Sequence, residues 1–151
     1  MQQPSLLNLN TQFDDPDWPE LVDVRTPSEG SKTAFPCLAF DLIIGAEISY
    51  FSGHFPEQAV LPGVVQVHWA AKLGRLWIQA NTKYSETIES SVQLKKVKFN
   101  TPVLPNYELS LELMYRAEKA QITFHYYNAE HTFSSGVINF PPSAAIKQPA
   151  T

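Results

Sequence analysis

One segment of this chain combines helical spacing with apolar residues over most of its circumference. It runs from Val64 to Ala80, after Pro62-Gly63 and before Asn81, which are typical start and stop signals of a helix. At about 100° per residue, its polar side chains gather on one narrow stripe. That stripe consists of His68, Lys72, Arg75 and Gln79. A helix that is apolar elsewhere must be covered by other elements, so the rest of the chain has to supply the covering surface.

The remaining sequence alternates apolar and polar residues with a period of two, which indicates half-buried β-strands. In the weakest of these runs, Val97 and Phe99 alternate with lysines. Turn signals between the runs fall at Pro105-Asn106, around 117–119 and at 128–130. The alternating runs cover 92–99, 109–114 and 122–127.

Two further strands are expected before the helix. Residues 21–25 and 32–44 suggest a hairpin that turns at Ser28-Glu29-Gly30, with Pro36 at a bulge or an edge position. We therefore expect an α+β fold in which an antiparallel sheet of about six strands is wrapped around one long central helix.

The two ends of the chain differ from its middle. Residues 1–19 contain prolines and an acidic run, Asp14-Asp15-Pro16-Asp17, and are expected to form an irregular lead-in. Pro141-Pro142 should end the last strand, because proline has no N–H for the ladder. Residues 141–151 lack apolar periodicity and are expected to be a mobile tail. A single domain, 20–140, lies between them, and its length suits one compact core.

Composition argues against several classes of protein. A formal net charge of −4 is unfavourable for binding nucleic acid, which needs clustered Lys and Arg. The single cysteine, Cys37, cannot form an intrachain disulfide, and the cytoplasm is the default compartment. No apolar run reaches the roughly 20 residues of a membrane helix, and the first residues do not resemble a signal peptide, so we expect no membrane insertion. The four histidines suggest no zinc site, and we expect no metal.

The segment with the strongest chemical content precedes the helix. It reads Phe51-Ser52-Gly53-His54-Phe55-Pro56 and continues with Val60-Leu61-Pro62-Gly63-Val64. It puts a histidine, the side chain best suited to moving a proton near neutral pH, in a turn-rich loop. It also places a helix N-terminus nearby, whose backbone N–H groups have no intrahelical partners and can receive negative charge.

These residues resemble a known family. G-H-F-P followed by V-L-P-G-V is similar to the FabZ and FabA type of 3-hydroxyacyl-[acyl-carrier-protein] dehydratase. A second stretch, from Phe99 to Asn106, resembles that family's F-x-x-P-V-x-P-G motif, with Asn106 where glycine is usual. Asparagine tolerates the left-handed backbone conformation better than most residues. The resemblance covers about residues 20–140, is strongest to the ApeI-like branch of aryl polyene biosynthesis, and implies a hotdog fold.

The resemblance also implies roles for particular residues. His54 would act at C2 of the substrate, with its ring oriented by the Val60 carbonyl. The family's acidic residue, which handles the departing hydroxyl, falls on His68, which is neither Glu nor Asp. We interpret this as a subgroup with paired histidines, because a protonated imidazole still carries out acid chemistry. The Gly63 N–H would polarise the thioester carbonyl, and Val64 beside it completes the expected substrate-binding group.

Partners follow from the same resemblance. The substrate would arrive on an acyl carrier protein with its phosphopantetheine arm, so no separate cofactor is expected. The enzyme would be at least a homodimer, with His54 of one protomer facing His68 of the other. Carrier proteins are acidic, so a basic patch would steer one in. The candidates for that patch are Lys95, Lys96 and Lys98, helped by Lys72 and Arg75.

Other interpretations stay open. His54 could have a structural role in a tight loop, and the stripe with His68 could be a solvated helix face. The basic patch could likewise be a solvated strand face. Instead of a dehydratase, the chain could be a hotdog acyl thioesterase, or a non-catalytic subunit that pairs with an active dehydratase. The remaining candidates are expected to be structural: Cys37 as a packed thiol, His125 and His131 as surface residues, and Tyr50, Phe51, Trp69 and Trp77 as core or dimer filler.

Overall fold

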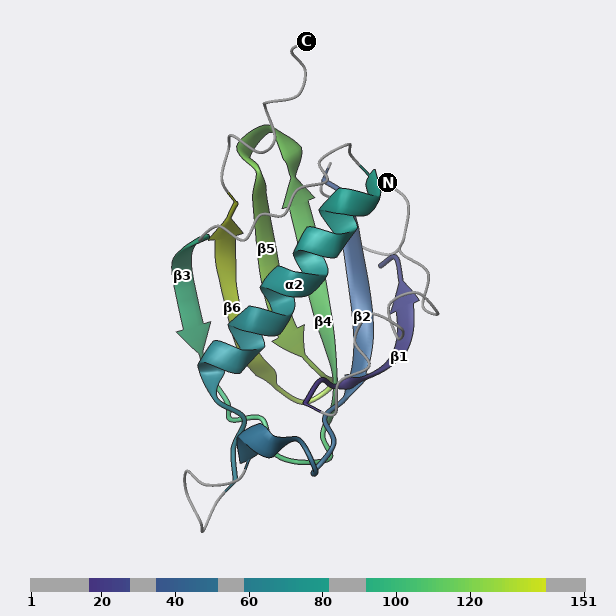
Figure 1. The fold of residues 1–151 in the computed structure, drawn as a ribbon, viewed down its shortest axis with the longest axis vertical. Coiled ribbons are helices and arrows are strands. Elements are labelled where there is room, and N and C mark those ends of the chain that lie inside the picture. The colour runs from purple at the N-terminus through teal and green to yellow at the C-terminus, as the bar shows by residue number, and fades with distance from the viewer. Residues whose placement is uncertain (1–16, 28–34, 52–58, 82–91, 141–151) are drawn as a thin grey trace.

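The computed structural model describes residues 17–27, 35–51, 59–81 and 92–140, and these form one six-stranded sheet with a long helix across one face (Figure 1). Every neighbouring pair of strands is antiparallel, and the order across the sheet is β1-β2-β4-β5-β6-β3. The helix α2 (Gly63–Asn81) follows the second strand in the chain, as the sequence predicts. This arrangement is the hotdog fold. The strands are β1 (Glu20–Arg25), β2 (Cys37–Ile43), β3 (Gln93–Phe99), β4 (Glu108–Arg116), β5 (Gln121–Tyr127) and β6 (Thr132–Asn139), and the short 3-10 helices are η1 (Ser49–Phe51) and η2 (Ala117–Lys119).

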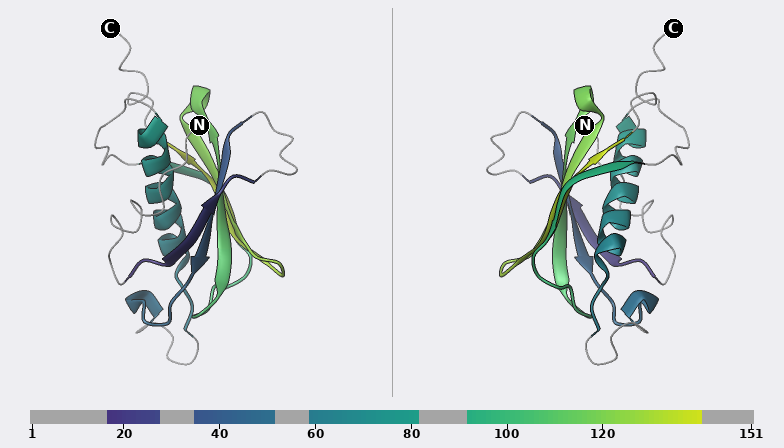
Figure 2. Two further views of the ribbon diagram at one scale, coloured as in Figure 1. Left: turned by 90° about the vertical axis from the view of Figure 1, so that its right-hand side faces the viewer. Right: turned by 90° about the vertical axis from the view of Figure 1, so that its left-hand side faces the viewer.

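The sheet curves around one side of α2, and the opposite side of the helix faces outward. The two edge-on views show the helix on a single face of the sheet (Figure 2). Val64 is 73% exposed, and His68 and Lys72 are also exposed. In this single chain the predicted wrapping is therefore partial, and it leaves the polar stripe of the helix open.

The core lies between α2 and the two central strands. Alternate residues of β4 and β5 point toward the helix and are almost fully buried. The helix contributes Trp69, Leu73 and Trp77, each 1% exposed. Burying one such side chain contributes about 1.5–3 kcal/mol, so this layer supplies much of the driving force for folding. The strand residues in it are Leu109, Leu111, Leu113, Ile122, Phe124 and Tyr126.

Two buried hydroxyl groups attach the first turns of α2 to the sheet. The Tyr126 hydroxyl donates to the backbone carbonyl of Gln66 at 2.7 Å, and Ser134 Oγ donates to Gln66 Oε1 at 2.6 Å. A buried polar group left unpaired costs about 1–3 kcal/mol, so these bonds favour one position of the helix N-terminus over others.

The turns agree with their sequence signals. Asn106 has φ 72°, the left-handed conformation expected where the family pattern has glycine. The Tyr107 N–H donates to the Leu104 carbonyl at 3.4 Å, which closes the turn with proline and asparagine at its centre. The turn between β5 and β6 is held by Asn128, whose Oδ1 accepts from the amides of Glu130 and His131 at 2.9 Å each.

Strand β3 departs from its predicted alternation. It pairs with β6 alone among the described strands, and its register shifts between Lys95 and Lys98, where Lys96 adopts φ 54°. Val97 is half-buried, and Phe99, which pairs with Ser134 on the side of the sheet that carries α2, is 55% exposed. The register shift is a β-bulge, which inserts one residue around Lys96 and interrupts the inward–outward alternation of this edge strand before Val97.

Of the two N-terminal strands, β1 matches the predicted 21–25 with one more residue at its start, and β2 is shorter than the predicted 32–44. Strand β2 begins at Cys37, and Pro36 lies just before it with its carbonyl accepting from the Tyr115 N–H at 3.0 Å. The predicted turn at Ser28-Glu29-Gly30 lies outside the described residues, as do 1–16 of the lead-in and the tail 141–151. Within the described part of the chain, no helix has the length and apolar character needed to span a membrane.

Candidate active site

The second part of the first motif, Val60-Leu61-Pro62-Gly63-Val64, meets the second motif in space at the N-terminus of α2. The Leu61 N–H donates to the Val103 carbonyl at 2.9 Å, which joins the segment before the helix to the segment after β3. Gly63 lies against Phe99, and a Cβ at position 63 would come within 2.6 Å of two ring carbons. Glycine is therefore the residue that lets the aromatic ring and the start of the helix approach this closely.

The first amides of α2 lie beside this contact. The Pro62 carbonyl accepts from the N–H groups of Val65 and Gln66, at 3.1 and 3.4 Å. The N–H groups of Gly63 and Val64 come earlier in the turn, where a helix provides no carbonyl partner. With Val64 exposed and Val60 half-buried, this end of the helix opens outward. Its dipole and its amides can stabilise negative charge on an oxygen.

The predicted base, His54, lies outside the described residues, and its role stays a prediction. The described chain reaches the edge of that segment from both sides. Phe51, the last residue of η1, is buried, and its N–H donates to the Ile48 carbonyl at 3.1 Å. The chain resumes at Ala59, directly before Val60.

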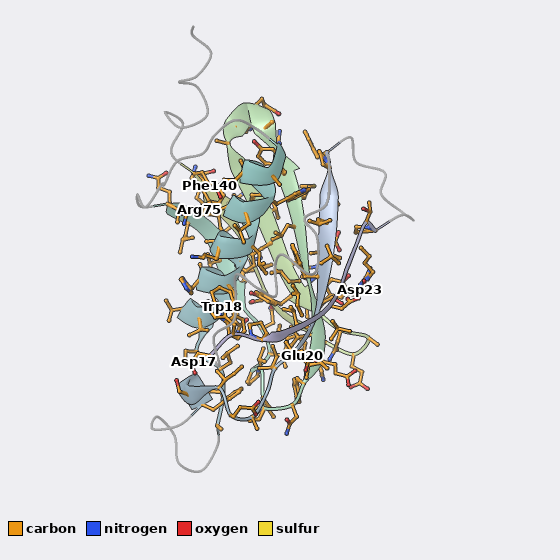
Figure 3. All side chains as sticks on the ribbon, turned by 45° about the vertical axis from the view of Figure 1, so that its right-hand side comes forward. Asp17, Trp18, Glu20, Asp23, Arg75 and Phe140 are labelled. Carbon is orange, nitrogen blue, oxygen red and sulfur yellow. The ribbon has the colours of Figure 1, made fainter. Side chains whose placement is uncertain are left out.

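The predicted acid, His68, lies on the outward face of α2, in the second turn of the helix. Its ring centroid is 5.6 Å from that of Trp18, with the two planes at 47°. Trp18 also lies 5.9 Å from Trp69, so its ring covers neighbouring positions of the helix. Figure 3 shows Trp18 against the helix, on the segment that leads into β1.

The electrostatic surroundings of His68 are positive. Partial removal of water from the ring lowers the pKa of His68, and the charges of Lys72 and Arg75 on the same stripe lower it further. Within the described part of the chain, no carboxylate forms an ion pair with either residue. Arg75 lies 5.7 Å from the centre of the Phe140 ring (Figure 3). The stripe therefore offers positive charge that the described chain does not neutralise.

The other basic candidates are on β3. Lys95, Lys96 and Lys98 are exposed, and the bulge at Lys96 falls in their middle. They are accessible to a partner, which is necessary for steering an acidic carrier protein but does not by itself assign them that role.

A separate hollow of about 460 Å³ lies on the sheet face that points away from α2. Asp41, Ser110 and Tyr127 line it and are paired directly across neighbouring strands. Tyr126, next in the chain, points to the helix instead, as its bond to Gln66 requires. This hollow is therefore on the other side of the sheet from His68.

The remaining candidates behave as structural residues. Cys37 is half-buried, and burial raises the pKa of its thiol. His125 stacks on Tyr127 at 4.9 Å and His131 is exposed, while Trp69 and Trp77 lie in the core. Among the described residues, no group of three or more His, Cys, Asp or Glu side chains gathers as metal ligands would.

Sequence reasoning missed two residues near the site. Trp18 lies in the segment expected to be irregular, and its one signal was a large aromatic side chain next to prolines and acidic residues. Gln66 is 4% exposed, and it could have been found as a polar residue on the apolar side of the predicted helix. Both act through contacts with distant parts of the chain.

Comparison with known proteins agrees with the fold and the motifs. The family model of the ApeI-like dehydratases, described as ApeI dehydratase, matches residues 30–137. The dehydratase heterocomplex ApeI:P from Xenorhabdus doucetiae contains a similar chain, with 26% identity, a TM-score of 0.59, and coverage of 81% of this chain and 96% of that one.

Curated relatives match over a shorter length. A 3-hydroxyacyl-[acyl-carrier-protein] dehydratase FabZ from Clostridium novyi is 36% identical over 64 residues, which is 42% of this chain and 45% of the relative. FabZ from Clostridium botulinum strain Okra is 34% identical over 93 residues, 62% of each. The chain thus spans about half to three-fifths of the length of these relatives.

The helix laid against a curved antiparallel sheet, with residues 60–64 and 99–106 together at the helix N-terminus, defines a protein of the hotdog-fold class. Within that class, the match over 30–137 places it further: the chain belongs to the ApeI-like dehydratase family.

Proposed function

We propose that this protein removes water from a 3-hydroxyacyl thioester carried on an acyl carrier protein and yields the trans-2-enoyl thioester. The observation that carries the proposal is the meeting of residues 60–64 and 99–106 at the start of the helix that bears His68. The contacts of Leu61 with Val103 and of Gly63 with Phe99 build an outward-facing helix N-terminus on the helix that also bears His68. Family membership and the FabZ relatives support the choice of reaction.

The proposed chemistry assigns one task to each group. His54 accepts the proton from C2, and the electron pair develops toward the thioester carbonyl. The Gly63 N–H donates to that oxygen and stabilises its charge without reorganising, while Val60 and Val64 flank the contact. His68 gives a proton to the C3 hydroxyl, which leaves as water while the C2–C3 double bond forms. One proton is taken up and one released, so the pair of histidines returns to its starting state by a proton transfer after product release.

The surroundings of His68 suit the role of an acid. A lowered pKa means that His68, once protonated, gives up its proton more readily, which helps a hydroxide-like leaving group depart. The opposing effect is that a smaller fraction of the ring is protonated at neutral pH. The two histidines titrate as a pair, and the singly protonated form is the one that offers a base and an acid together.

The proposed assembly is a homodimer in which His54 of one protomer serves the site that contains the other protomer's His68. Leu94, Phe99 and Val64 are exposed apolar side chains on β3 and at the start of α2, and β3 has a described strand partner on one side only. Such a surface is suited to contact with another chain. The proposed compartment is the cytoplasm, in keeping with a single cysteine.

A heterocomplex is the second candidate. The similar chain from Xenorhabdus doucetiae belongs to a dehydratase heterocomplex, ApeI:P, and position 68 of this protein holds histidine where the FabZ type has an acid. In this version the chain pairs with a second dehydratase subunit and contributes little catalysis alone.

One set of assays separates these functions. The purified chain is given a 3-hydroxyacyl carrier substrate and, separately, an acyl-CoA. We expect a loss of one water from the carrier-bound acyl group and an enoyl absorbance, without release of free thiol. Free thiol from both substrates would identify a thioesterase instead. No turnover by the chain alone, restored by a second subunit, would support the heterocomplex.

His68→Gln and Gln79→Ala provide a matched pair for the same assay. Both positions lie on the polar stripe of α2, but Gln79 is about three turns further along the helix. The proposed function requires a large loss for His68→Gln and parent-like turnover for Gln79→Ala. Equal rates in the two variants would remove His68 from the mechanism.

A further inference from the structure

We propose that Trp18 is a positioning residue for the reaction: it holds the His68 imidazole against α2 and shields it from water. The inference rests on the proposed function, because it gives Trp18 a task in the same site. It adds a residue outside both motifs, from a part of the chain expected to be an irregular lead-in.

The contact geometry supports this role. The Trp18 and His68 ring centroids are 5.6 Å apart and the planes are tilted by 47°, within the range in which aromatic rings attract each other. His68 lies on the outward face of the helix, where solvent would otherwise let its side chain change rotamer. Trp18 is itself half-buried and packs against the core, with its ring centroid 5.9 Å from that of Trp69. This packing restricts the position of the Trp18 ring.

A hydrogen bond holds the Trp18 segment in place. The neighbouring Asp17 accepts the Ser49 N–H on its Oδ1 at 2.8 Å (Figure 3). Ser49 begins η1, whose last residue directly precedes the segment with His54. The lead-in thus contacts the element before the predicted base at one residue and the helix with the predicted acid at the next. These two contacts fix where Trp18 lies on the helix.

The His68 ring is influenced by two charges on its own helix, and the lead-in carries one acidic residue directly before Trp18. On its own helix, Lys72 and Arg75 face it, and both favour the neutral ring. From the lead-in, Asp17 is the nearest acidic residue in the chain to Trp18, and its carboxylate is engaged by the Ser49 amide. Replacing Trp18 leaves these charges unchanged. An upward change in the His68 titration would therefore report the return of water to the ring.

The first experiment follows the His68 ring directly by NMR across pH, in the parent, Trp18→Ala, Trp18→Phe and Val24→Ala. The His68 signal is identified by its loss in His68→Gln. Val24 is the matched control, since it is also a partly buried residue packed on the core from the N-terminal segment. We expect Trp18→Ala to move the His68 chemical shift and raise its titration midpoint, whereas Trp18→Phe and Val24→Ala stay close to the parent.

The second experiment measures kcat and KM for the carrier-bound substrate over the same pH range. Trp18→Ala should lower kcat about 10-fold or more with little change in KM, because a displacement of about 1 Å at a reacting group can cost 10²-fold. The acid limb of its pH profile should move to higher pH, and Trp18→Phe should restore most of the parent's behaviour. Val24→Ala should lower the melting temperature without altering the profile.

The possible outcomes distinguish a failure of the inference about Trp18 from a failure of the proposed function. An unchanged His68 signal in Trp18→Ala overturns the inference, whatever the activity. A changed signal with unchanged kcat and pH profile overturns the role in the reaction. If the parent fails to dehydrate the substrate, the proposed function fails on its own, and the NMR titration still decides whether Trp18 shields and positions His68.

Discussion

On the sheet face that points away from α2, Arg25 and Asp41 form an ion pair, whereas the outward face of the helix leaves its positive charges without carboxylate partners among the described residues. On the sheet, Arg25 Nε and Nη2 donate to the two Asp41 oxygens at 3.0 Å each, and Ser110 Oγ donates to Asp41 Oδ1 at 2.7 Å. These contacts raise the pKa of Arg25 and lower the pKa of Asp41. On the helix, Lys72 and Arg75 instead lower the pKa of His68.

The difference teaches how each face contributes. A charge that is paired within the folded chain stabilises that fold. Its partner neutralises most of its field, so it attracts a ligand only weakly. A charge that is unmatched brings no such gain, and it can meet negative charge that arrives from outside. We therefore assign the Arg25–Asp41 pair on the sheet face to stability and the helix face to function. The following predictions test this division.

The largest effect is expected from His68→Ala on the helix face. Loss of a general acid typically costs about 10²–10⁴-fold in rate, while loss of an exposed side chain changes stability little. Turnover of the carrier-bound substrate should fall strongly, whereas the melting temperature should stay close to that of the parent. Parent-like turnover would mean that the stripe is only a solvated helix face.

The pH dependence of activity should change by nearly as much. Adding a second proton to the histidine pair removes the base, and losing its single proton removes the acid, so the rate should be bell-shaped and fall about 10-fold per pH unit on each side. The acid limb should lie below the ordinary histidine value of about 6.5, because the pKa of His68 is lowered. His68→Glu should remain active with a displaced profile. An identical profile would show that His68 does not titrate in the mechanism.

The sheet face should respond in the opposite way. Asp41→Ala removes the partner of a half-exposed Arg25 and should lower the free energy of unfolding by about 1–2 kcal/mol, with activity within about twofold of the parent. Denaturant unfolding measures the free energy of unfolding, and the dehydration assay measures the activity. Asp23→Ala, an exposed carboxylate on β1, is the control and should change neither.

The same pair predicts a sign for acid sensitivity. Since the folded-state pKa of Asp41 is lowered, its contribution is present above the unfolded value of about 3.9 and is lost as pH falls through the folded value. The fall in stability on acidification should be shallower in Asp41→Asn than in the parent. A strong loss of activity in either Asp41 variant would break the division between the faces.

A smaller effect is expected at the basic residues of β3. Glutamate at positions 95, 96 and 98 should reduce kcat/KM for the carrier-bound substrate several-fold at low salt, because surface charges mainly govern encounter. A small thioester mimic should be turned over as before. Equal losses on both substrates would indicate a structural role for Lys95, Lys96 and Lys98.

The smallest effect belongs to neither face. Asn106 has φ 72°, so Asn106→Gly should change the free energy of unfolding by only a few tenths of a kcal/mol, whereas Asn106→Val should cost about 1–2 kcal/mol. Denaturant unfolding of both variants checks the turn. Equal stabilities would mean that the left-handed conformation is not needed there.

The sequence determined the elements whose signals are local. The start, the length and the buried side of α2 followed from apolar spacing, and the alternation in β4 and β5 followed from the pleat. The turn at Asn106 followed from its proline and asparagine. His54 and His68 were found through motif spacing, but of the two the structure describes His68, which it places on the outward face of the helix.

Tertiary structure alone decided the contacts between distant positions. Trp18 contacts His68, 50 residues further along the chain, and Gln66 contacts Ser134, 68 residues further along. Neither contact produces a periodic pattern in the sequence. The bulge in β3 likewise depends on how that edge strand pairs with β6. Local patterns record which side of an element is apolar, because that choice depends on spacing along one element. Which residue of another element fills the opposite position depends on how the whole sheet curves and packs, so this part of the site emerged only from the folded chain.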